Sequence, residues 1–472
     1  MNVVQRLFKN MGFTAFSQFF TAIIAFILLI YIARYLGEDG YGIYNFALSF
    51  TILFTIFSDL GITQFIIREI ARKKAATNYY LTNAFLIKCI LSMVAFGLIV
   101  AIIWIIDYPQ DLRTIIYLFA IYNILISFSE LFTSIFQANE KMEYASIVQV
   151  TEKLILITLG LYVIFSGYGL LELAYVYIFA ALTCTLVGLL LLLKVAHPKI
   201  QINHRIWKDL TLSSLPFGIN AVFAMIFFKI DVVLLGLLDS SIVVGVYSAA
   251  YNPLLSLSMM LTGIVITAIY PVMSRYFIDA KDSLTKLTIL TLKYMGIIGF
   301  PIAVGCFVLA DKFILLFYGG QYLDSVLVFQ ILAFFIPIRL TSSITGTFLY
   351  STDKQNFRSI AVVICAFLNI ALNITLIPFL SYIGAAIATI ISEIILYILY
   401  FRYIKVENRR AINKTFLKPL LAALIMGIIC YQIKEINLLL VIVTGMISYF
   451  VVLMLLNTFT KEDKDIIRQL LR

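Results

Sequence analysis

The chain has 472 residues, of which 62% are hydrophobic and only 13% are charged, and its formal net charge is +10. Soluble domains contain about 25% charged and about 45–50% apolar residues, so these proportions exclude a water-soluble enzyme. They also exclude a disordered chain, a coiled coil and a disulfide-rich secreted domain.

Apolar runs separated by short polar breaks follow one another along the chain. Because about 20 apolar residues cross a bilayer as one helix, the runs predict an all-α integral membrane protein with about 14 transmembrane helices. The first run exceeds the hydrophobic region of a signal peptide, so it is predicted to remain as the first helix. Tight turns are predicted at 166–169 and 380–382. Five prolines are predicted to kink or end their helices: Pro216, Pro271, Pro301, Pro337 and Pro378. The predicted helices cover residues 11–34, 41–62, 79–106, 112–136, 146–166, 170–195, 210–236, 244–271, 284–311, 326–349, 358–379, 383–403, 416–434 and 438–459.

Basic residues gather on one side of these helices. With the N-terminus inside, 26 of the 35 Lys and Arg residues fall in cytoplasmic segments, and only Arg34, Arg113, Lys312 and Lys434 fall on the opposite side. Lys and Arg bias their loops to the cytoplasm, so the sequence predicts a multi-pass protein of the cell (cytoplasmic) membrane with both termini cytoplasmic. The positive charge then faces anionic membrane lipids, and no nucleic acid is expected as a partner.

The chain also carries a weak internal repeat. Gly-Ile-Tyr-Asn-Phe-Ala at 42–47 corresponds to Gly-Val-Tyr-Ser-Ala-Ala at 245–250, and Lys88 corresponds to Lys293. Six helices is an even number, so two six-helix bundles of the same orientation are predicted, related by a pseudo-twofold axis along the membrane normal. The predicted parts are an N-terminal bundle (1–200), a C-terminal bundle (201–405), and an unduplicated helix pair, helices 13 and 14, with a cytoplasmic tail (406–472).

Several short motifs occur in a characteristic order over residues 5–405. They lie at 34–37, 41–44, 59–61, 68–69, 231–236, 245–251, 270–275, 316–319, 369–378 and 384–386. As a set they resemble the polysaccharide-repeat (O-antigen type) flippases of the multidrug/oligosaccharidyl-lipid/polysaccharide exporter superfamily. This resemblance implies a transporter, not an enzyme, that moves a lipid-pyrophosphate-linked oligosaccharide from the inner to the outer leaflet. It also suggests a polysaccharide polymerase and glycosyltransferases as partners. Helices 13 and 14 resemble the added pair of the lipid II flippases.

Nine charged residues fall deep inside the predicted helices, where a charge facing lipid costs about 2.5–3.5 kcal/mol. None has an opposite charge three or four positions away on its own helix, the spacing at which helical neighbours touch. The adjacent Glu152 and Lys153 are predicted to point to different sides. Partners must therefore come from other helices, water or substrate. The nine are Lys88, Glu130, Glu152, Lys153, Lys229, Asp231, Lys293, Arg339 and Glu393.

We interpret four of these cations, Lys88, Lys293, Arg339 and Lys153, as candidate substrate-binding residues. In a hydrated cavity, Arg binds a diphosphate through planar bidentate contacts and Lys binds it as a point charge. The alternative interpretation is ion pairing between helices, with long side chains snorkelling toward helix ends.

Three deep acids, Glu130, Glu152 and Glu393, are candidates for ion coupling, because intramembrane carboxylates are typical of proton and ion pathways. No phosphate-binding G-x-x-x-x-G-K-[ST] motif occurs, so ATP hydrolysis by this chain is not expected. The five cysteines form no C-x-x-C pair, and His197 and His204 share one polar connection. Neither a cofactor nor a metal site is therefore predicted.

Three other functions remain open. A multidrug or cation antiporter of the same superfamily would have a cavity dominated by acidic residues. A membrane-embedded polysaccharide polymerase or glycosyltransferase would need a sizeable extramembrane loop with carboxylates. A structural membrane scaffold would leave the deep charges unexplained.

Overall fold

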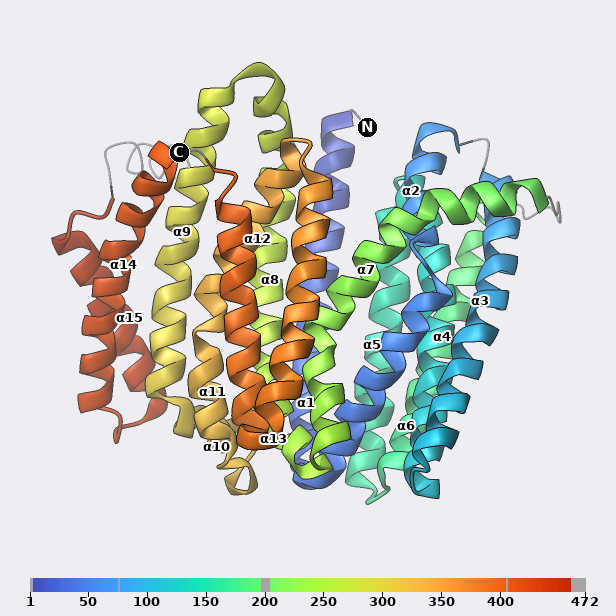
Figure 1. Ribbon diagram of the computed structural model, residues 1–472, viewed down its shortest axis with the longest axis horizontal. Helices are drawn as coiled ribbons and strands as arrows, with labels where there is room; N and C mark the ends of the chain where they lie inside the picture. Colours follow the sequence, from blue (N-terminus) through green and yellow to red (C-terminus); the bar gives the residue numbers. More distant parts are fainter. Residues whose placement is uncertain (1–2, 75–76, 197–203, 405, 460–472) are drawn as a thin grey trace. The chain divides into compact units, whose positions relative to one another are not determined.

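The computed structural model describes residues 3–74, 77–196, 204–404 and 406–459, and every regular element among them is a helix (Figure 1). Within these described ranges, twelve helices are long and apolar enough to cross a membrane. Two of these, over Ser17–Ser58 and Gln355–Phe401, each contain a pair of predicted helices, so the described residues hold the fourteen that the apolar runs predict. The predicted all-α membrane fold is confirmed.

The chain divides into two compact units, residues 1–245 and 246–472. The boundary predicted at 200/201, like His197 and the tail from 460 onward, lies outside the described residues, and the three-part division stays a prediction. The first unit contains α1 (Val3–Thr55), η1 (Ile56–Ser58), α2 (Ile62–Arg72), α3 (Thr77–Ile106), α4 (Gln110–Ala138), α5 (Met142–Phe165), α6 (Leu170–Leu192), α7 (His204–Leu238) and the start of α8 (Ser241–Asp279). The second contains the rest of α8, then α9 (Lys281–Val308), α10 (Ala310–Phe317), η3 (Gly320–Tyr322), α11 (Ser325–Ala333), α12 (Phe335–Ser351), α13 (Gln355–Phe401), α14 (Val406–Gln432) and α15 (Leu438–Leu455).

Two long helices are interrupted where the sequence predicts a break. In α1 the break lies at Gly37, whose φ of 68° and ψ of −178° suit glycine almost exclusively. In α13 it lies at Ser381, with a φ of 51°, inside the predicted turn 380–382. These breaks separate the first and second, and the eleventh and twelfth, predicted helices.

The five prolines behave in two ways. Pro337 and Pro378 each lie within one helical turn of a break. By contrast, α7, α8 and α9 continue through Pro216, Pro271 and Pro301 without ending. Of these two prolines, only Pro378 lies near a residue that leaves the helical conformation, Ser381, whereas Phe334 before Pro337 keeps helical dihedral angles.

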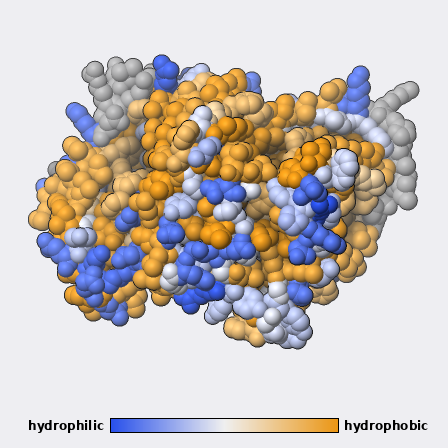
Figure 2. Space-filling model, turned by 60° about the horizontal axis from the view of Figure 1, so that its bottom comes forward, coloured by the Kyte–Doolittle hydropathy of each residue, from blue (hydrophilic) through white to orange (hydrophobic). Residues whose placement is uncertain are grey.

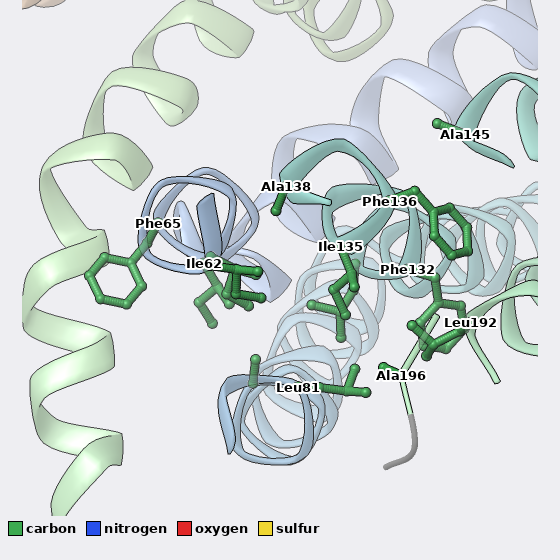
Figure 3. Packing of buried hydrophobic residues seen from close by; sticks show 14 of the residues in the cluster. Ile62, Phe65, Leu81, Phe132, Ile135, Phe136, Ala138, Ala145, Leu192 and Ala196 are labelled. Carbon is green, nitrogen blue, oxygen red and sulfur yellow. The ribbon is translucent and has the colours of Figure 1, made fainter. Parts of the chain in front are cut away.

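The apolar runs do not predict the short helix α2, because they indicate only a polar connection after residue 62. In α2, Ile62, Phe65, Ile66 and Ile70 recur every three or four positions and are all buried. Figure 3 shows Ile62 converging with residues of α3 and α4 on one hydrophobic cluster. The prediction missed α2 because a window as long as a membrane span averages this apolar face with the charges around it.

In the second unit, the C-terminal helices α14 and α15 pack on α9. Val304 of α9, Met426 of α14 and Leu453 of α15 belong to one buried cluster, and the Tyr449 hydroxyl donates a hydrogen bond to the Ile297 carbonyl at 2.8 Å. Elsewhere, large hydrophobic areas cover much of the surface seen in Figure 2, as expected for side chains that face lipid. The unduplicated helix pair is thus part of the core of its own unit.

Candidate functional site

A cavity of about 370 Å³ lies inside the first unit, between η1 and the adjoining end of α1, α2, α4, α5 and α7. Although the chain is mostly hydrophobic, polar residues outnumber apolar ones in the lining, and none of the lining residues that the structure describes is a Lys or an Arg. The polar lining residues are Thr55, Asp59, Thr63, Gln64, Asn123, Ser127, Glu130, Thr133, Ser134, Gln137 and Gln149. A polar cavity among membrane-spanning helices is the candidate functional site of this unit.

Helix α4 supplies one wall of the cavity. Its lining residues Asn123, Ser127, Glu130, Ser134 and Gln137 are spaced by three or four positions, which places them on one helix face. At 1.5 Å per residue, this stripe runs for about 21 Å along the helix. The Ser134 hydroxyl donates to the Leu131 carbonyl at 2.7 Å, so it is satisfied within its own helix. The polar stripe therefore forms without breaking α4.

Asp59, directly after η1, lines the cavity and forms an ion pair with a buried cation. Lys88 of α3 is fully buried, and its Nζ lies 2.6 Å from Asp59 Oδ1. The Thr63 hydroxyl and backbone amide also donate to Asp59. Lys88 is not a lining residue; the ammonium is separated from the cavity by the carboxylate that neutralises it. Its predicted role in holding a diphosphate stays a prediction.

Four lining side chains keep their hydrogen-bonding groups available. Within the described part of the chain, Glu130, Gln64, Gln137 and Gln149 form no side-chain hydrogen bond and no ion pair. Glu130, a predicted ion-coupling candidate, is an exposed residue whose side chain lines the cavity. These four groups offer one carboxylate and three carboxamides to a ligand.

A second, smaller pocket of about 210 Å³ lies among α1, α4, α5 and α6 of the same unit. Lys153 lines it together with Tyr44, Tyr122 and Tyr177, and aliphatic residues of α1 and α5 complete the wall. The Tyr44 and Tyr177 hydroxyls are hydrogen-bonded at 2.5 Å. This pocket combines one cation with a largely apolar surface.

The prediction that Glu152 and Lys153 point to different sides is wrong. Lys153 Nζ lies 2.9 Å from Glu152 Oε1, and the Tyr122 hydroxyl donates to the same oxygen at 2.8 Å. The flexible four-carbon side chain of lysine turns back toward its neighbour, whereas the prediction considered only where the two Cβ atoms point. Glu152 is therefore shared between a cation and a buried tyrosine.

The remaining predicted residues lie in the second unit. Arg339 of α12 lies 3.4 Å from Glu393 of α13, which is fully buried and also accepts a hydrogen bond from the Ser342 hydroxyl. Lys293 of α9 is buried as well. For Lys88 and Arg339, the inference that partners come from other helices is confirmed.

Sequence reasoning missed part of the cavity lining. Asp59 belongs to the motif at 59–61 but is not among the nine deep charges, and the uncharged Gln64, Gln137 and Gln149 do not meet that criterion either. The polar stripe on α4 could have been found, because its three- and four-residue spacing is visible in the sequence. Gln64 and Gln149 could not, since only the packing of α2 and α5 brings them to this wall.

The apolar helices define a multi-pass membrane protein with a polar cavity in its first unit. The chain belongs to the family of polysaccharide biosynthesis proteins, whose sequence pattern matches residues 7–277. It is 23% identical over 406 residues to the capsular polysaccharide biosynthesis protein CapF of Staphylococcus aureus, covering 84% of this chain and 99% of that protein.

Two solved structures have the same fold. The lipid II flippase MurJ in an inward closed conformation has a TM-score of 0.77 and 16% identity, covering 98% of this chain and 99% of that one. An inward-facing multidrug resistance transporter of the MATE family has a TM-score of 0.68 and 14% identity, covering 85% of this chain and 98% of that one. The resemblance to polysaccharide flippases of this superfamily is confirmed.

Proposed function

We propose that this protein flips lipid-pyrophosphate-linked oligosaccharide repeat units from the inner to the outer leaflet, for the assembly of a polysaccharide or surface glycan. Its family and its capsular polysaccharide relative support a role in polysaccharide biosynthesis. Its fold, like those of MurJ and the MATE transporters, supports transport by alternating access. A transporter rather than an enzyme is the function proposed.

The polar cavity of the first unit carries this proposal. A glycan entering hydrocarbon loses the water bound to each hydroxyl, and an unreplaced hydrogen bond costs several kcal/mol. Carboxylates, carboxamides and hydroxyls along about 21 Å of α4 replace those bonds inside the membrane. The cavity therefore lowers the free-energy barrier to moving the glycan, which is the polar part of the substrate, across the hydrocarbon of the membrane.

The charged residues are proposed to serve transport in two ways. Lys153, which is partly exposed and lines the smaller pocket, is the cation best placed in its unit to meet an anionic group. Lys88, Lys293 and Arg339 remain candidate phosphate contacts that a conformational change would have to expose. Glu130, Glu152 and Glu393 are candidate carriers of the coupling proton or cation.

The proposed setting is the cell (cytoplasmic) membrane, with both termini in the cytoplasm. The excess of basic residues in the segments assigned to the inner side supports this orientation. A polysaccharide polymerase and glycosyltransferases are the proposed functional partners, because they would use the product and supply the substrate.

A multidrug or cation antiporter is the second candidate, and one observation favours it. Among the residues that the structure describes, the cavity is lined by two carboxylates, Asp59 and Glu130, and by no basic residue. An acidic lining is what a site for organic cations requires.

Reconstitution into proteoliposomes tests both functions. A fluorescent polyprenyl-diphosphate oligosaccharide placed in both leaflets is bleached from outside by dithionite. Flipping is expected to make nearly all of the dye accessible, against about half in protein-free vesicles. A cation antiporter would instead leave about half of the dye protected from dithionite. It would transport ethidium in exchange for protons when a proton gradient is imposed. Product analysis of the same vesicles would reveal a longer glycan if the protein were a polymerase.

A further inference from the structure

We propose that the cavity of the first unit binds the uncharged saccharide part of the substrate, through Glu130, Gln64, Gln137 and Gln149, and leaves the diphosphate outside. This inference rests on the proposed flipping function and specifies which part of the substrate this cavity accepts. It differs from the expectation that deep cations hold the diphosphate at the same place.

The first argument is the supply of hydrogen-bonding groups. A carboxylate accepts hydrogen bonds at two oxygens, and each carboxamide both donates and accepts. Sugar hydroxyls and N-acyl groups need this mixture of acceptors and donors. None of these four side chains is engaged in a hydrogen bond or ion pair within the described part of the chain, so their capacity is free for a ligand.

The second argument is charge. Asp59 is neutralised by Lys88 at 2.6 Å, whereas Glu130 has no described Lys or Arg within 4 Å. The described lining therefore carries one carboxylate, Glu130, that is outside any described ion pair and interacts with Lys88 only at longer range, and none of its described residues is basic. A diphosphate or a uronate placed there would be repelled by Glu130 in surroundings that screen charge less than bulk water does. An uncharged sugar meets no such repulsion.

The third argument is size and shape. The volume of about 370 Å³ lies within the usual range for small-ligand sites, which is about 300–1,000 Å³. The polar stripe extends the site along α4 for about 21 Å, so a linear glycan can contact it at several rings. No aromatic side chain is among the described lining residues, so recognition by these residues depends on hydrogen bonds to the ring edges rather than on stacking.

A cysteine protection experiment tests the inference on the purified full-length protein. Ile67→Cys places a thiol in the cavity wall without altering the four proposed contacts, and Arg72→Cys places one on an exposed part of the same helix. The unsubstituted chain, with its five free cysteines, gives the background. The rate of maleimide labelling is measured with a panel of neutral oligosaccharides, with trigalacturonate and with inorganic pyrophosphate.

Neutral oligosaccharides from the panel are expected to slow labelling of Ile67→Cys at least threefold and to leave Arg72→Cys unchanged. Trigalacturonate and pyrophosphate are expected to leave both rates unchanged. Equal protection by pyrophosphate, or no protection by any neutral oligosaccharide, would overturn the inference. Because binding is measured without transport, this failure is distinguishable from failure of the proposed function, which the flipping assay on the same protein decides.

A substitution of Glu130 tests whether its negative charge excludes anionic saccharides from the cavity. Glu130→Gln keeps the hydrogen-bonding shape and removes the charge, so trigalacturonate is expected to protect Ile67→Cys by at least threefold in this background. Asp111→Asn removes a carboxylate from the same helix outside the cavity and is expected to change nothing. If Glu130→Gln still excludes trigalacturonate, Glu130 does not set the selectivity and the proposed contact is wrong.

Discussion

The ammonium of Lys88 is fully buried 2.6 Å from Asp59, and Asp59 alone of the two residues lines the cavity. Lys88 thus neutralises a carboxylate in the cavity wall, while its own ammonium group does not line the cavity. In this structure the pair presents a carboxylate, and not the ammonium, to the cavity.

Removal of Lys88 alone is expected to destabilise the protein, because Asp59 would lose its buried counter-charge. Breaking a buried ion pair costs about 3–5 kcal/mol, and the lower end applies because Asp59 touches the cavity. Lys88→Met should therefore lower the apparent melting temperature in detergent. Lys88→Met/Asp59→Leu should recover most of that loss, since both charges are removed. A double variant that melts as low as the single one would contradict the pairing.

The same double variant separates a structural role of Lys88 from substrate binding. If Lys88 only neutralises Asp59, the purified double variant Lys88→Met/Asp59→Leu should retain a flipping rate within about threefold of the wild type. If Lys88 holds the diphosphate, a stable double variant should lose flipping. The proteoliposome assay, normalised to reconstituted protein, distinguishes the two results.

Tyr122→Phe is expected to destabilise the first unit by about 1.5–3 kcal/mol, the usual range for a hydrogen bond to a charged group. Its hydroxyl donates to Glu152 at 2.8 Å in a buried site, and the rest of the ring contacts are retained in the variant. Tyr162→Phe, on the exposed side of α5, is the matched control and should melt like the wild type. Equal melting of both variants would show that the Tyr122 hydroxyl contributes nothing.

The ion pairs Arg339–Glu393 and Lys434–Asp311 of the second unit are expected to differ strongly in their effect on stability. Glu393 is fully buried beside Arg339, so Glu393→Ala should destabilise by about 3–5 kcal/mol. Asp311 and Lys434 are 3.7 Å apart and partly exposed, and Asp311→Asn should cost less than about 1 kcal/mol. Thermal melting at low and high salt checks this, and salt should affect only the Asp311 pair. Similar losses for both variants would refute the assigned difference in burial.

Gly218→Ala is expected to disturb the fold where α7 meets the chain between η1 and α2. A Cβ atom at this position would lie 2.5 Å from the backbone carbonyl of Leu60, which no side-chain movement relieves. Overpacking of this kind typically costs about 1–3 kcal/mol. Gly97→Ala, where a Cβ meets nothing within 4 Å, should be neutral or slightly stabilising in its helix. Fluorescence-detected size exclusion after a heat series compares the two.

The candidate site could be predicted only in part. Glu130 was identified because a carboxylate inside an apolar helix is costly and therefore rarely placed by chance. Its neighbours on α4 have a readable spacing, but the contributions of Gln64 and Gln149 depend on α2 and α5 packing beside that helix. Lys88 was correctly expected to need a partner from another helix, and the identity of that partner, Asp59, was not predicted.

The sequence by itself determined the class of protein, the number of helices and the breaks at Gly37 and Ser381. These properties depend on hydrophobicity and backbone preference summed over neighbouring residues, which are local. The tertiary structure alone decided which charges meet, because Arg339 and Glu393 are 54 positions apart and their pairing depends on how α12 lies against α13. It also decided that the described residues lining the cavity between α2, α4, α5 and α7 include acidic and amide residues rather than cations.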